Sequence, residues 1–160
     1  MLPVQASGDR SIWVRYCKTY LPPCLETHKP LDLVIILLGN NYLKMRFSVS
    51  AYYIANGART LVQIAQKSAT GPGDTASQVL LLAPPPVAKL TGFAEMFEGA
   101  EAKSRRFAEH YARVAQECGC AFLDTGQVIV SSDLDGIHLE ASDQTMLGAA
   151  VAARVREILG

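Results

Sequence analysis

An unbroken run of branched apolar residues, from Leu33 to Leu38, constrains the fold of this chain more than any other segment. Such a run is typical of a parallel strand that is buried on both faces of its sheet. Parallel strands need long crossover connections, which are usually helices, so the run predicts an α/β architecture. It ends in Gly39, Asn40 and Asn41. Because ligands bind beyond the carboxyl ends of such strands, these residues mark either a binding site or only a turn.

Strand and helix patterns alternate along the rest of the chain. Two further short apolar runs, residues 79–82 and 120–123, indicate strands. Apolar residues recur at helical spacing in three other ranges, which are residues 54–65, 107–118 and 147–158. This alternation predicts a parallel sheet with helices on both faces, that is, a three-layer α/β/α fold.

Composition bounds the class of protein. The chain has 160 residues, and we expect one soluble domain that spans residues 1–160. Its 15 basic residues equal its 15 acidic residues, which predicts no attraction to nucleic acid or to an anionic membrane.

The apolar runs are too short to span a membrane and no signal peptide is evident, so we expect a cytoplasmic protein. The four cysteines lack zinc-site spacing, and His28 and His110 lack ligand companions, so we expect no metal and surface positions for both histidines.

A candidate catalytic base lies just before the last helical stripe. Asp135 precedes His138 by three residues. A carboxylate at this spacing can bend back in a loop, fix the tautomer of the imidazole through Nδ1, and stabilise the imidazolium that forms when Nε2 takes a proton. The same spacing also fits a solvated loop histidine. If His138 is a base, the amide of Asn41 is a candidate donor to an oxyanion.

Three segments resemble, in order, the blocks of the SGNH (GDSL) hydrolases, especially their bacterial arylesterase-like branch. They are residues 38–44 (Leu-Gly-Asn-Asn-Tyr-Leu-Lys), 82–86 (Leu-Ala-Pro-Pro-Pro) and 135–138 (Asp-Gly-Ile-His). The resemblance covers nearly the whole chain and implies a flavodoxin-like sheet. It makes Asn41 the oxyanion donor of the family's Gly-x-Asn-Asp block. Tyr42 replaces the final Asp of that block, which changes the packing and hydrogen bonding of the loop.

The amino-terminal residues resemble the family's second block. Residues 8–13 read Gly-Asp-Arg-Ser-Ile-Trp, and the resemblance implies that the backbone N–H of Gly8 also stabilises the oxyanion. The family's first block, an apolar strand followed by Gly-Asp-Ser-Leu with the nucleophilic serine, is expected upstream of residue 1, so we expect an N-terminally truncated fold. An alternative interpretation takes residues 8–11 as an interrupted Gly-Asp-Ser, with Ser11 as the nucleophile.

The resemblance implies a serine ester hydrolase that acts on a small-molecule ester and needs no metal or organic cofactor. The segment 84–93 is expected to form one wall of the acyl pocket. In the flavodoxin-like order the first strand lies inside the sheet, so without it the neighbouring strand edges would be free to pair with another chain. Either Pro3 to Ala6 shifts to close the gap, or the protein associates, or the isolated chain is poorly stable; of these outcomes we expect a homo-oligomer. The alternative function is a catalytically silent SGNH-like binding or assembly module.

Overall fold

Three parallel strands form the centre of the fold. The computed structural model describes residues 12–160, with side chains from residue 17 onward. The strands are β1 (Leu33–Leu37), β2 (Gln78–Ala83) and β3 (Ala121–Asp124), in the spatial order β1-β2-β3. In register, Ile35 of β1 lies beside Leu80 of β2. All carboxyl ends therefore lie at one edge of the sheet.

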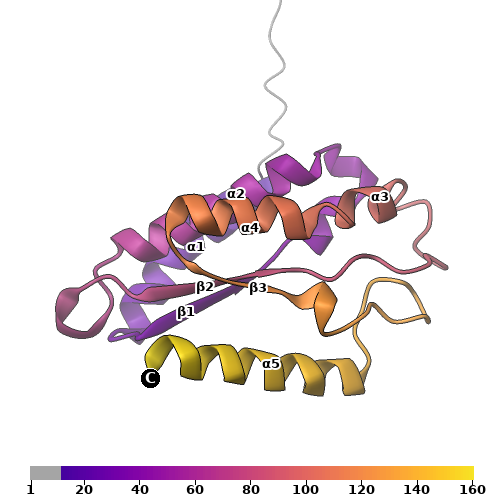
Figure 1. Cartoon of the computed structure of the whole chain (residues 1–160). Coiled ribbons are helices and arrows are strands. Elements are labelled where there is room, and N and C mark those ends of the chain that lie inside the picture. The colour runs from indigo at the N-terminus through magenta and orange to yellow at the C-terminus, as the bar shows by residue number, and fades with distance from the viewer. Residues whose placement is uncertain (1–11) are drawn as a thin grey trace, which may run out of the picture.

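Helices cover both faces of this sheet (Figure 1). On one face α1 (Ile12–His28) packs against α2 (Ala51–Lys67), and α2 packs against α4 (Phe107–Cys118). The short helix α3 (Ala100–Ser104) precedes α4. On the other face α5 (Ala141–Leu159) is the one helix among the described residues, and it packs against β3. The predicted three-layer α/β/α arrangement with a parallel sheet is confirmed. None of the helices within residues 12–160 is long and apolar enough to cross a membrane.

The core lies between the sheet and the α2–α4 layer. One face of α2 is buried, and its apolar residues recur at the spacing that the sequence predicted: Ala51, Ile54, Ala55, Ala58, Leu61, Val62 and Ala65. The hydroxyl of Ser50 caps α2 by accepting a hydrogen bond from Tyr53 N at 3.4 Å. Residues 79–83 of β2 are all buried because this central strand has covered faces and two neighbouring strands.

β1 differs from the expectation of a strand buried on both faces. Ile36 is buried, but Ile35 is 44% exposed and Leu37 is 39% exposed. The reason is that α5 packs against β3, at the far side of the sheet from β1. Within residues 12–160, no strand pairs with the outer edge of β1.

Two other features were not foreseen. Helix α1 was not expected, and it contains Pro22 and Pro23. Proline in a helix interior removes a backbone hydrogen bond, so packing against α2, with Leu25 buried, stabilises this helix. The expectation of a surface position was wrong for His110, which is 5% exposed on α4. It was correct for His28, which is exposed at the end of α1.

Candidate active site

Asp135 and His138 form a hydrogen-bonded pair in the loop before α5. Nδ1 of His138 lies 2.5 Å from Oδ2 of Asp135. The other carboxylate oxygen, Oδ1, accepts hydrogen bonds from the backbone N–H groups of Ile137 at 2.8 Å and His138 at 2.9 Å. The carboxylate therefore holds both the imidazole ring and the backbone that carries it. The predicted Asp-x-x-His pair is brought together in space.

The hydrogen bonds of Asp135 fix its protonation state. The imidazole of His138, followed by the two backbone N–H groups, lowers the pKa of Asp135 to about 2. An ionised carboxylate only accepts hydrogen bonds, so Nδ1 of His138 carries a hydrogen, and in the neutral ring Nε2 carries the lone pair. No described residue hydrogen-bonds to Nε2, and the side chain of His138 is 71% exposed. The nitrogen that a general base uses is thus accessible.

Gly136 makes the tight turn possible. Its φ is +82°, a left-handed conformation that residues other than glycine rarely adopt. An added Cβ would also lie 2.7 Å from the carbonyl oxygen of Lys89. Its carbonyl accepts a hydrogen bond from Ala88 N at 2.9 Å, and its N–H donates to Ser132 O at 2.8 Å. The turn is therefore joined to the segment after β2.

At the end of β1, Gly39 begins a second tight turn. Its φ is +153°, and an added Cβ would lie 2.6 Å from the hydroxyl of Tyr111 and 3.1 Å from Cγ of Pro84. That hydroxyl, on α4, donates to the carbonyl of Leu38 at 2.5 Å. Burial raises the pKa of Tyr111, so the hydroxyl keeps its hydrogen and anchors the end of β1. The chain then enters the 3₁₀ turns η1 (Asn40–Leu43) and η2 (Met45–Phe47).

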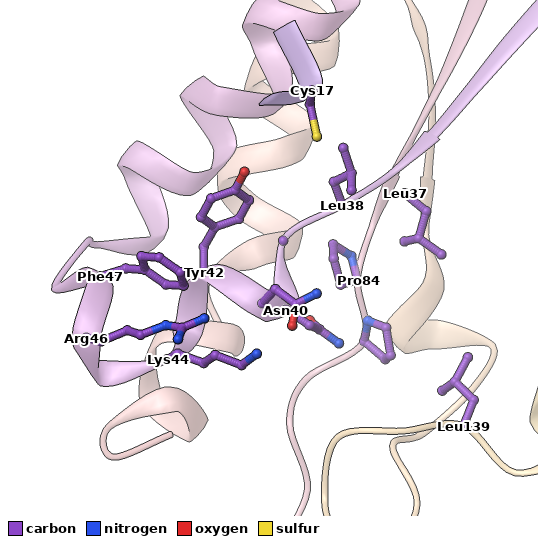
Figure 2. Close-up of a pocket in the computed structure, with 13 residues that line it drawn as sticks. Cys17, Leu37, Leu38, Asn40, Tyr42, Lys44, Arg46, Phe47, Pro84 and Leu139 are labelled. Carbon is purple, nitrogen blue, oxygen red and sulfur yellow. The ribbon is translucent and has the colours of Figure 1, made fainter. Parts of the chain in front are cut away.

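A pocket of about 370 Å³ lies at the carboxyl ends of β1 and β2 (Figure 2). This volume is within the usual range for small-molecule sites. Asn41 lines the pocket and is exposed, while Asn40 also lines it with a buried Oδ1 that has no hydrogen-bond partner among the described residues. Leu139, the residue after His138, lines the same pocket. The full set of lining residues is Cys17, Leu37, Leu38, Gly39, Asn40, Asn41, Tyr42, Lys44, Arg46, Phe47, Pro84, Pro85 and Leu139.

The remaining predicted residues have different positions. Gly8 and Ser11, which the sequence predicted as the second oxyanion donor and the alternative nucleophile, lie outside the described residues. Of the segment expected to form a wall, Pro84 and Pro85 line the pocket. Phe93 lies edge-on to the His138 ring, with the ring centres 6.2 Å apart.

Sequence reasoning did not assign a role at this site to Cys17, Lys44 or Arg46. Cys17 reaches the pocket from α1, a helix that was not predicted. Lys44 and Arg46 follow the Asn40-Asn41 turn by only a few residues. Two cationic residues so soon after the turn at the end of a strand are the sequence feature that could have indicated their place at the site. Within residues 12–160, no three His, Cys, Asp or Glu side chains come together in a way that could hold a metal ion.

Comparisons with known proteins agree with this fold. The model of the GDSL-like lipase/acylhydrolase family matches residues 4–146. No curated protein gives a significant match. Among solved structures, an aryl esterase of M. smegmatis is 41% identical with a TM-score of 0.83, and the match covers 88% of this chain and 67% of that one.

Two proteins of Sinorhizobium meliloti are also similar. The carbohydrate acetylesterase Est24 is 40% identical with a TM-score of 0.84, covering 88% of this chain and 67% of its own. A carbohydrate acetylesterase family member is 33% identical with a TM-score of 0.83, covering 89% of this chain and 68% of its own. The fold is that of ester hydrolases. The chain belongs to the GDSL-like lipase/acylhydrolase family, and its arylesterase-like resemblance is confirmed.

Proposed function

We propose that this protein is a serine ester hydrolase in which His138 is the general base and Asp135 orients it. The observation that carries the proposal is the 2.5 Å hydrogen bond between these side chains, which leaves Nε2 accessible. A neutral imidazole with a fixed tautomer is what a serine needs, because its hydroxyl is a weak nucleophile without a base.

The steps follow from these roles. The serine Oγ attacks the ester carbonyl carbon while its proton moves to Nε2 of His138. The oxyanion accepts hydrogen bonds from the amide of Asn41 and the backbone N–H of Gly8. The carbon–oxygen bond to the alcohol then breaks, and the imidazolium returns the proton to the leaving oxygen. Water, activated by His138, releases the acid and restores the serine.

We further propose that the nucleophile belongs to a Gly-Asp-Ser-Leu segment at the end of an additional strand, rather than being Ser11. The outer edge of β1 supports this, because no strand within residues 12–160 pairs with it and it is adjacent to the pocket that holds Asn41. About a third of each matched relative also lies outside the match. The substrate we propose is a small ester, since the pocket is small and the relatives are named as an aryl esterase and a carbohydrate acetylesterase.

Hydrolysis of 4-nitrophenyl acetate by the chain extended upstream with an apolar strand that ends in Gly-Asp-Ser-Leu tests the base. We expect His138→Ala to reduce kcat/KM by at least about 100-fold, the lower range for general-base catalysis. His28→Ala is the control, because His28 bonds only within α1, with Nδ1 2.8 Å from Cys24 O. Equal activity of the extended chain with and without His138→Ala would refute the proposed base.

A second candidate function is a binding or assembly module, which the exposed side chains of β1 favour. Ile35 and Leu37 lie at the outer edge of β1, with which no strand in the described part of the chain pairs, and such an edge is a template for pairing with a second copy. We propose self-association through this edge. Sedimentation velocity tests it: Ile35→Lys should shift the chain to monomer, whereas the exposed control Leu134→Lys should not. A parent chain that is monomeric at tens of micromolar would contradict it.

A further inference from the structure

The pocket at the end of β1 has a net positive lining in a protein with no net charge. Two of its lining residues, Lys44 and Arg46, are cationic, and no acidic side chain lines it among the described residues. Tyr42 contributes no negative charge, because burial, with a smaller effect of Cys17, raises its pKa to about 12. A ligand in this pocket therefore meets two positive charges with no compensating carboxylate in the lining.

Both cations are positioned by aromatic rings rather than by acidic partners. Nζ of Lys44 lies 5.7 Å from the ring centre of Phe97, and the guanidinium of Arg46 lies 4.8 Å from that of Phe47. These distances are those of cation–π contacts, which restrain a cation without neutralising it. Figure 2 shows both side chains along the same side of the pocket, with their nitrogen ends toward Asn40.

Four other described cations form ion pairs with carboxylates. Ion pairs join Lys29 to Glu26, Arg59 to Glu117, Arg113 to Glu109 and Arg154 to Glu157. Neither Lys44 nor Arg46 forms a salt bridge with a described residue. Their donors thus remain available to a bound anion.

We propose that the pocket selects esters that carry a carboxylate, such as the half ester of a dicarboxylic acid, with the carboxylate bound between Lys44 and Arg46. A guanidinium donates two parallel hydrogen bonds to a carboxylate, and an ammonium adds a point charge. This inference rests on the proposed ester hydrolysis for the fate of the ligand. It concerns binding, which can be measured without turnover.

The test uses the His138→Ala chain, so that bound esters remain intact. Monoethyl glutarate, which is anionic, is compared by calorimetry and NMR titration with its neutral isostere, ethyl 4-carbamoylbutanoate. We expect the anion to bind about tenfold more tightly. Arg46→Gln and Lys44→Gln should each weaken the binding of the anion about 3- to 10-fold. This loss lies between the contribution of an exposed ion pair and that of a charge-assisted hydrogen bond. Both should leave the neutral ligand unchanged.

Two further variants distinguish a site from general electrostatics. Arg46→Lys should retain most of the preference, and Arg105→Gln, at an exposed position outside the lining, should not change it. Equal binding of the two ligands, no binding of either at millimolar concentration, or equal weakening of both by Arg46→Gln would overturn the inference. If the preference is found and 4-nitrophenyl acetate is not hydrolysed by the chain extended upstream with the Gly-Asp-Ser-Leu strand, the anion site stands and the proposed hydrolysis fails.

Discussion

Asp135 binds His138 twice, through the imidazole Nδ1 at 2.5 Å and through the backbone N–H at 2.9 Å. One carboxylate therefore sets both the position of the ring and the conformation of the loop that presents it. Asparagine at position 135 could still accept the two backbone hydrogen bonds through its amide oxygen. Its NH₂ group, however, would present a donor to Nδ1 of His138, where the carboxylate presents an acceptor.

Asp135→Asn should consequently lower kcat much more than it alters the fold. The matching substitution in a serine protease triad costs about 10⁴-fold because the histidine takes the wrong tautomer. We expect a loss of this order in ester hydrolysis by the chain extended with the Gly-Asp-Ser-Leu strand, with the circular dichroism spectrum unchanged. Asp133→Asn is the control, because Asp133 is exposed in the same loop. A loss below tenfold for Asp135→Asn would remove Asp135 from the catalytic pair.

Gly136→Ala tests whether the turn geometry is required. The left-handed backbone costs a side chain about 1–2 kcal/mol, and the added Cβ would lie 2.7 Å from Lys89 O. We expect a lower urea midpoint and a lower kcat, since the turn carries Asp135. Gly148→Ala is the matched control: it lies in α5 with nothing within 4 Å of an added Cβ, and it should raise stability by about 0.5–1 kcal/mol. Equal effects of both substitutions would contradict a special role for the turn.

Asn41→Ala should affect the chemical step. Loss of a preorganised oxyanion donor typically lowers kcat by about 100- to 1,000-fold, with a smaller change in KM. Asn40→Ala should be milder, because the proposed oxyanion donor is the neighbouring amide. Steady-state kinetics of the extended chain on 4-nitrophenyl acetate separate kcat from KM. A change confined to KM in Asn41→Ala would assign this residue to substrate binding.

The burial of His110 predicts that the protein is less stable at acid pH. Both ring nitrogens are buried without a described partner, and burial, followed by the charge of Arg106, lowers the pKa of the imidazole below 6.5. Below about pH 6.5 the unfolded chain binds a proton that the folded chain does not, so stability falls as the pH falls. His110→Leu should reduce this loss between pH 7.5 and 5.5 in thermal unfolding. An unchanged pH dependence would contradict it.

Local patterns predicted most of the architecture. The apolar runs at residues 79–82 and 120–123 became β2 and β3 within a residue or two, and the Asp-x-x-His spacing became a hydrogen-bonded pair. Both signals are contained in a few consecutive residues, which is why the sequence alone carries them.

The features that were missed depend on contacts between distant segments. Helix α1 is stabilised by packing on α2 despite Pro22 and Pro23, which propensity disfavours. The exposure of Ile35 depends on where α5 lies, which no pattern within β1 reveals. The joint lining of the pocket by Lys44 and Arg46 likewise follows from the folded ends of β1 and β2.

Labelling with a fluorophosphonate, followed by mass mapping of the modified residue, tests the central claim most directly. The probe reacts with a serine only when a base activates it. We compare the 160-residue chain with a form extended upstream by an apolar strand that ends in Gly-Asp-Ser-Leu, each with and without His138→Ala. The account predicts rapid labelling of the added serine in the extended form, weak labelling of the short form, and loss of both in His138→Ala. Labelling at the same rate with and without His138→Ala, or no labelling of the extended form, would contradict the account.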